Sequence, residues 1–177
     1  MRVSCAAFAR TCSRRTLLRA LTGFALALAI GSGVLAADAP TVVVVGLDGR
    51  TQSLCAADLV ALQPREVDVT DPHGKQPARY RGVPLLSVLA LVGAPVGDAL
   101  RGKGLSLHVR AEASDGYVAA FSLAELDAGF GKTEALVAFE RDGQPLTADV
   151  GPFRLVVPSD ARGGRWVRGL VKLRVLD

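Results

Sequence analysis

Residues 151–175 read GPFRLVVPSDARGGRWVRGLVKLRV and carry much of the information about architecture and function. The mostly apolar runs 153–157 and 170–175 have the length and composition of β-strands. The loop between them contains two glycines, three arginines and Trp166, the only tryptophan of the chain. A loop that is both flexible and rich in hydrogen-bond donors is a candidate binding site.

The rest of the chain predicts more strands than helices. Ser53 is expected to cap a short helix that contains Cys55 and ends near Leu62. A second helix is expected to start at Pro84, and a capping box in Ser122-Leu123-Ala124-Glu125 predicts a third. Further strands are expected at residues 41–45, 66–70, 80–83, 105–111, 117–121 and 134–139. Because strands and helices do not alternate regularly, we predict an α+β fold with a mixed β-sheet and a few short helices.

Residues 1–36 are predicted to be an export signal. They contain five arginines and no acid, and they include a short apolar stretch at 21–30 before small residues. This composition is typical of a cleaved signal, and the stretch is short for a stable membrane anchor. Arg14 and Arg15, followed by Thr-Leu-Leu, resemble a twin-arginine signal. We therefore expect residues 37–177 to form a single periplasmic domain.

Removal of that segment changes the charge balance. The whole chain has 21 Lys and Arg against 17 Asp and Glu, a net charge of +4. Without the five arginines of the signal, 16 basic residues face 17 acidic ones. The predicted domain therefore has no basic excess that would indicate nucleic-acid binding. It also keeps one cysteine, Cys55, and so cannot form an internal disulfide.

Three segments resemble the oxidoreductase molybdopterin-binding domain, the sulfite-oxidase fold. They are RYRGVPLLSVLALVGAP (79–95), ASDGYVAAFSLAEL (113–126) and the stretch 151–175. The resemblance is closest to small exported bacterial members, and it implies a molybdopterin cofactor and two-electron oxo-transfer. In that family a cysteine thiolate on the strand before the YRGVPL-like segment binds molybdenum. Here that strand, residues 67–71, has no cysteine, and Cys55 comes too early, so no metal ligand is predicted.

The same resemblance supplies a candidate cofactor site. Arg165-Trp166 matches a Lys-Trp pair near the pterin, and Arg162 resembles an arginine of the family's loop. Guanidinium groups and glycine amides suit a phosphate-bearing pterin or another anionic small molecule. The candidate cofactor-binding residues are Arg162, Arg165, Gly163, Gly164, Ser159, Asp160 and His73.

Each candidate also has a purely structural interpretation. The arginines could pair with surface acids, and Ser159-Asp160 could only form a turn. Trp166 is expected to fill the core. His73, on an exposed turn, could line a residual pocket or be merely solvated.

Two functions follow from these observations. The first is an exported molybdopterin-dependent oxidoreductase of the sulfite-oxidase type. Because the sequence lacks a Cys-x-x-Cys-His haem-attachment motif, its electrons would pass to a separate electron-transfer protein. The alternative is a non-catalytic binding module of the same fold that binds an anionic small molecule or a partner protein.

Overall fold

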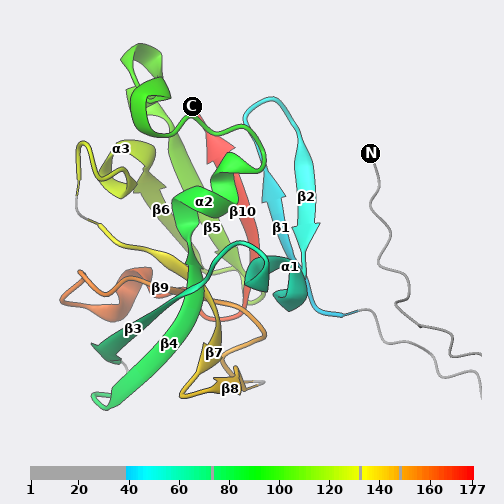
Figure 1. Ribbon diagram of the computed structural model, residues 1–177, viewed down its shortest axis with the longest axis vertical. Coiled ribbons are helices and arrows are strands. Elements are labelled where there is room, and N and C mark those ends of the chain that lie inside the picture. The colour runs from blue at the N-terminus through cyan, green and yellow to red at the C-terminus, as the bar shows by residue number, and fades with distance from the viewer. Residues whose placement is uncertain (1–38, 73, 132, 148) are drawn as a thin grey trace, which may run out of the picture. The chain divides into compact units, whose positions relative to one another are not determined.

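The computed structural model describes residues 39–72, 74–131, 133–147 and 149–177 (Figure 1). The predicted export segment, residues 1–36, lies outside these residues. The α-helices are α1 (Ala56–Val60), α2 (Leu85–Ala90) and α3 (Leu123–Leu126), and the 3-10 helices are η1 (Gly97–Ala99), η2 (Gly102–Ser106) and η3 (Gly163–Arg165). The strands are β1 (Val42–Val45), β2 (Thr51–Leu54), β3 (Arg65–Thr70), β4 (Pro77–Pro84), β5 (His108–Ala113), β6 (Val118–Ser122), β7 (Leu136–Arg141), β8 (Gln144–Pro145), β9 (Arg154–Val156) and β10 (Leu170–Leu176).

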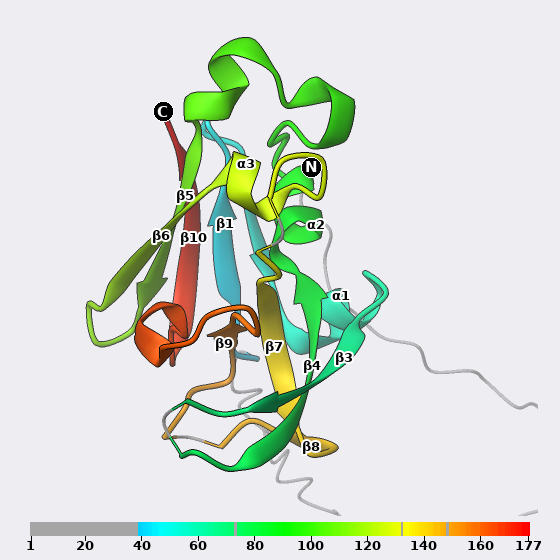
Figure 2. The same ribbon diagram turned by 90° about the vertical axis from the view of Figure 1, so that its left-hand side faces the viewer.

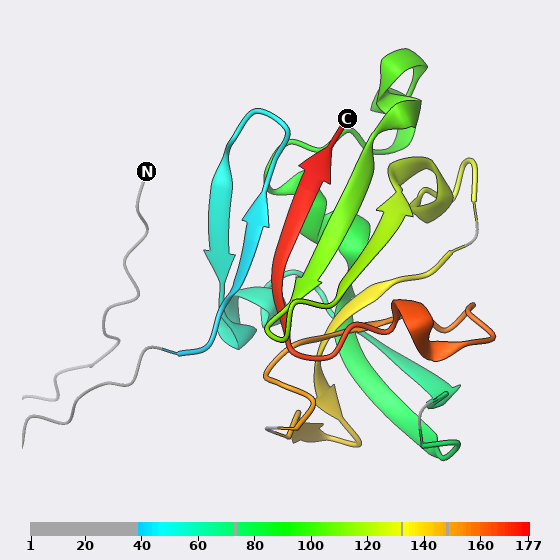
Figure 3. The same ribbon diagram turned by 180° about the vertical axis from the view of Figure 1, so that it is seen from behind.

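The first sheet has the strand order β2-β1-β10-β5-β6 (Figure 3). The last strand, β10, runs parallel to β1, with Leu173 opposite Val44, and antiparallel to β5, with Val175 opposite Val109. Alternate residues of these strands are buried, as expected for a sheet with one face on the core. The C-terminal strand thus joins the β1–β2 hairpin to the β5–β6 hairpin.

The second sheet has the order β3-β4-β7-β8, and β9 pairs with β7 on the same side as β8. All of its pairs are antiparallel, with Val67 opposite Tyr80 and Leu155 opposite Val137. Since β9 belongs to this sheet and β10 to the other, residues 157–169 connect the two sheets (Figure 2). The loop that the sequence singled out is therefore held at both of its ends by sheet hydrogen bonds.

A single apolar cluster joins the two sheets to α2. Leu173 from the first sheet, Leu155 from the second and Leu89 from α2 are fully buried members of it. Burial of a leucine side chain stabilises a fold by about 1.5–3 kcal/mol. This shared core fixes the positions of the strand ends from which the loops of the candidate site extend.

The sequence correctly predicted the fold class and most of the strands. The capping box of α3 is present: Ser122 Oγ accepts a hydrogen bond from the amide of Ala124 at 3.2 Å, and Glu125 Oε1 accepts one from the amide of Ser122 at 2.9 Å. The turn at Asp115-Gly116 joins β5 and β6 as expected, with Gly116 at φ +86°. Such a backbone conformation favours glycine.

Two local predictions were wrong. Ser53 is not a helix cap: it lies in β2 opposite Val43, because the chain after the Asp48-Gly49 turn pairs back onto β1. The helix starts three residues later, with Cys55 at its N-cap. The strand expected from residue 105 begins only at His108, because residues 102–106 form η2, where Gly102 has a φ of +56°.

Candidate functional site

The loop between β9 and β10 is anchored by Trp166. Its indole ring is buried, and its Nε1 donates a hydrogen bond of 2.8 Å to the carbonyl oxygen of Val157. The amide of Leu155 donates to the carbonyl of Val167 at 2.8 Å and closes the base of the loop. The core position expected for Trp166 is confirmed, since a buried tryptophan normally finds a partner for its N–H.

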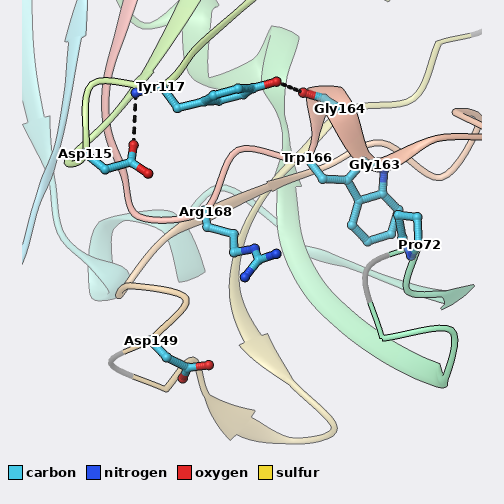
Figure 4. Close-up of a pocket in the computed structure, with 8 residues that line it drawn as sticks. All are labelled: Pro72, Asp115, Tyr117, Asp149, Gly163, Gly164, Trp166 and Arg168. Atoms are coloured by element: carbon cyan, nitrogen blue, oxygen red, sulfur yellow. Dashed lines mark hydrogen bonds between the residues drawn. The ribbon is translucent and has the colours of Figure 1, made fainter.

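A pocket of about 500 Å³ opens beside one edge of this tryptophan (Figure 4). We call it the Trp166 pocket. Its lining comes from the tip of the β5–β6 hairpin, from the chain after β3, from η3 and from the loops before β9 and β10. The lining residues are Pro72, Asp115, Tyr117, Asp149, Gly163, Gly164, Trp166 and Arg168. A volume of this size suits a small organic ligand.

The wall of the pocket at η3 is fixed by Tyr117. The phenol of Tyr117 donates a hydrogen bond to the carbonyl oxygen of Gly164, and its amide donates to Asp115 Oδ1 at 2.9 Å (Figure 4). A Cβ added to Gly164 would meet no atom within 4 Å, so this turn borders open space rather than packed side chains. The glycine turn is thereby held in position while its surface faces the pocket.

The pocket carries charges of both signs. Arg168 is exposed, and its guanidinium extends into the pocket (Figure 4). Asp149 accepts a hydrogen bond from the hydroxyl of Thr147, and this bond, together with weaker effects that include the Arg168 charge, lowers the pKa of Asp149 below its usual value. Asp149 is therefore ionised at neutral pH, and the pocket offers a cation and carboxylates together.

Arg165, a predicted cofactor-binding residue, is held by acids. Its Nε and Nη2 donate to the two oxygens of Asp160 at 2.8 and 2.7 Å, and its Nη1 donates to Glu125 Oε2 at 3.0 Å. The guanidinium carbon also lies 4.6 Å from the ring centroid of Phe121. The hydrogen bond to Asp160 is the main cause of a raised Arg165 pKa. These contacts attach η3 to α3 and β6.

A second, buried group of ionisable residues lies next to Trp166. Asp71, directly after β3, is 3% exposed, and Arg154 of β9 is 1% exposed. Arg154 Nη1 lies 3.0 Å from Asp71 Oδ2 and 2.7 Å from the oxygen of Tyr80, whose hydroxyl donates to Asp71 Oδ2 at 2.7 Å. Burial, followed by the bond to Asp71, raises the Tyr80 pKa to about 12. We call these three residues the buried cluster.

The buried cluster touches Trp166 as well. The guanidinium carbon of Arg154 lies 5.2 Å from the Trp166 ring centroid and 5.4 Å from that of Tyr80. The rings of Tyr80 and Trp166 meet edge to face at 6.0 Å. Trp166 therefore contacts a buried ionic cluster and also lines the open pocket.

The structure brings only some of the predicted site residues to the pocket. Gly163 and Gly164 line it, whereas Arg165 and Asp160 bind each other. Ser159 and Arg162 are exposed and do not line it. His73 lies outside the described residues.

Sequence reasoning missed Arg168 and Asp149 as pocket residues and Asp71 and Arg154 as partners. The last two are 83 positions apart, and no local pattern links them. Arg168 belongs to the donor-rich loop, so the loop itself was the only available signal.

The described residues offer no evident metal centre. In residues 39–177 apart from the three omitted positions, no three His, Cys, Asp or Glu side chains gather so as to hold a metal ion. Cys55 is absent from the pocket lining, and its amide donates to Asp58 Oδ2 at 2.8 Å. Over the same part of the chain, no helix is long and apolar enough to cross a membrane.

Known proteins with a similar sequence pattern and a similar fold exist. The model of the oxidoreductase molybdopterin binding domain matches residues 34–177. A crystal structure of the sulfane dehydrogenase SoxCD from Paracoccus pantotrophus superimposes with a TM-score of 0.59 at 21% sequence identity. The match covers 78% of this chain and 38% of that one, so the present chain corresponds to only part of the larger protein. A comparison with curated proteins gives no match. The fold and the family predicted from the sequence are both confirmed, whereas the closer resemblance to small exported bacterial members stays a prediction.

The described pocket fits the organic part of such a cofactor and not its metal. Glycine amides and a guanidinium are suitable donors to a phosphate, and the carboxylates are suitable acceptors for N–H groups of a heterocycle. A molybdenum centre of this family needs a soft thiolate, and no lining residue carries sulfur.

Proposed function

The chain belongs to the oxidoreductase molybdopterin-binding domain family, and from that premise we propose that it is an exported domain that binds a phosphate-bearing pterin, or a similar heterocyclic anion, in the Trp166 pocket. The observation that carries this proposal is the mixed charge of the pocket. A simple anion would gain nothing from Asp115 and Asp149, whereas a pterin presents both N–H donors and a phosphate.

Different lining residues suit the two ends of such a ligand. Arg168 and the turn at Gly163-Gly164 suit the phosphate, because guanidinium and backbone N–H groups are strong donors to oxyanions. Asp115 and Asp149 suit the N–H groups of the heterocycle. Trp166 would offer an aromatic edge to the ring system.

The fluorescence of Trp166 gives a direct test. Since it is the only tryptophan and lines the pocket, its emission should respond to a ligand bound there. We expect saturable quenching by a pterin monophosphate, weaker binding of the unphosphorylated pterin, and little effect of inorganic phosphate. Equal affinities for pterin monophosphate and phosphate would show that the heterocycle is not recognised.

Catalysis is the second candidate function, and family membership favours it. In that case the chain would act in two-electron oxo-transfer and would pass electrons to a separate protein. The cofactor would supply the redox chemistry when bound, and Arg168, the glycine turn and the two aspartates would hold and orient its organic part. Catalytic turnover with sulfur oxyanions and an artificial electron acceptor distinguishes this function from binding alone.

Export is supported by the arginine-rich sequence before residue 37 and can be tested separately. We expect Arg14→Lys together with Arg15→Lys to leave the precursor in the cytoplasm, because a twin-arginine signal requires the pair. Cell fractionation measures this. Normal processing of the double variant would indicate the general secretory route.

A further inference from the structure

The end of β3 is where the family resemblance and the structure disagree. The resemblance places a thiolate on this strand, but the strand is followed by Asp71, a carboxylate. Its side chain is not directed to a vacant site: it accepts hydrogen bonds from Tyr80 and Arg154. Asp71 is therefore committed to the interior and does not line the pocket.

The buried, charged surroundings of Asp71 hold its side chain in this position. Arg154 and Tyr80 are both buried, and Arg141 Nη1 lies 3.8 Å from Asp71 Oδ2 on the more exposed side. A buried carboxylate that left Arg154 would leave an uncompensated charge in the interior. Asp71 is also a hard oxygen ligand, whereas the centre implied by the family is held by a soft sulfur.

We infer that this chain holds its pterin-class ligand without molybdenum, and that the lack of a thiolate near the end of β3 decides this property. The inference rests on the proposed function for the identity of the ligand. The neighbouring Pro72 lines the Trp166 pocket, whereas Asp71 belongs to the buried cluster. A thiolate introduced at position 72 would thus border the pocket and leave the cluster intact.

The test compares three forms of the full chain, produced in a bacterium that makes the molybdenum cofactor: wild type, Pro72→Cys and Ser159→Cys. The last variant is a control, since Ser159 is exposed on the loop between β9 and β10 but does not line the pocket. Replacement of Asp71 itself is avoided because it would leave Arg154 without its carboxylate. Molybdenum per chain is measured by plasma mass spectrometry, and pterin by fluorescence after oxidation.

We expect little molybdenum in wild type and in Ser159→Cys, and at least about tenfold more in Pro72→Cys, since even indirect partners of metal ligands change metal affinity by 10–100-fold. Stoichiometric molybdenum in wild type would overturn the inference, and its loss in Cys55→Ala or His73→Ala would then identify the ligand. Equal molybdenum in wild type and Pro72→Cys would overturn it too.

Failure of the inference can be told apart from failure of the proposed function. The Trp166 titration with pterin monophosphate needs no metal. Intact titration with unchanged molybdenum in Pro72→Cys overturns the inference alone, whereas a molybdenum gain without any response in the titration overturns the proposed function alone.

Discussion

Two groups of polar and charged residues lie next to Trp166, and they differ in their burial and in their partners. In the buried cluster, Asp71, Tyr80 and Arg154 bind one another and are shielded from solvent. In the Trp166 pocket, Arg168 and Asp149 extend into open space. Arginine and aspartate thus stabilise the fold in the buried cluster, whereas in the Trp166 pocket they remain accessible to a ligand. Burial and partners, rather than residue type, separate the two roles.

Arg154→Met tests the buried side and should have the largest effect. Removal of one partner from a buried ion pair leaves the other charge uncompensated and costs about 3–5 kcal/mol of unfolding free energy. Arg79→Met is a matched control, because Arg79 pairs with Asp68 at 2.7 Å on an exposed surface, where solvent screens the pair and its loss should change stability little. Urea denaturation of both variants measures the difference. Similar losses would mean that burial does not distinguish the pairs.

Arg165→Gln tests whether the loop arginine belongs with the structural group. Its three hydrogen bonds to Asp160 and Glu125 are partly exposed, so their loss should cost about 1–2 kcal/mol. Affinity for pterin monophosphate should hardly change, and Arg165→Lys should restore part of the stability. A large drop in affinity at unchanged stability would instead place Arg165 in the ligand site, as the sequence suggested.

Tyr80→Phe tests the buried cluster through its pH dependence, which is the smallest of the three expected changes in stability. The folded-state pKa of Tyr80, about 12, lies above the unfolded value of 10, so its contribution is complete below pH 10 and is lost as the pH rises through 12. Wild type should therefore lose about 1 kcal/mol between pH 10 and 11 through this group. In Tyr80→Phe that part of the decline should vanish, whereas Tyr117→Phe should keep it. Denaturation at both pH values measures the slopes.

Local patterns predicted the parts of the fold that depend on neighbours in sequence. The capping box at Ser122 and the Asp115-Gly116 turn were recognised because the interacting groups are only a few residues apart. The β2 strand was missed, since its polar residues become a strand only by pairing with β1. Sheet order was likewise not predictable, because the pairing of β10 with β1 joins the two ends of the domain.

The candidate site shows the same limit. The loop that the sequence singled out contributes Gly163, Gly164 and Trp166 to the pocket lining. It could not assign the arginines to fold or ligand, because Glu125, one partner of Arg165, and Asp71, the partner of Arg154, lie 40 and 83 residues away in the sequence. The family resemblance supplied the fold, but the role of Asp71 at the end of β3 depends on partners that only the three-dimensional structure reveals.

We propose that the exposed charges of the Trp166 pocket bind the ligand, whereas the charges of the buried cluster stabilise the fold. The most direct measurement is the dissociation constant of pterin monophosphate, followed by Trp166 quenching, for wild type, Arg168→Gln and the control Arg174→Gln on the exposed face of β10. We predict about tenfold weaker binding for Arg168→Gln, since a charge-assisted hydrogen bond contributes about 1.5–3 kcal/mol, with an unchanged melting temperature. Wild-type affinity in Arg168→Gln, or an equal loss in Arg174→Gln, would contradict the claim.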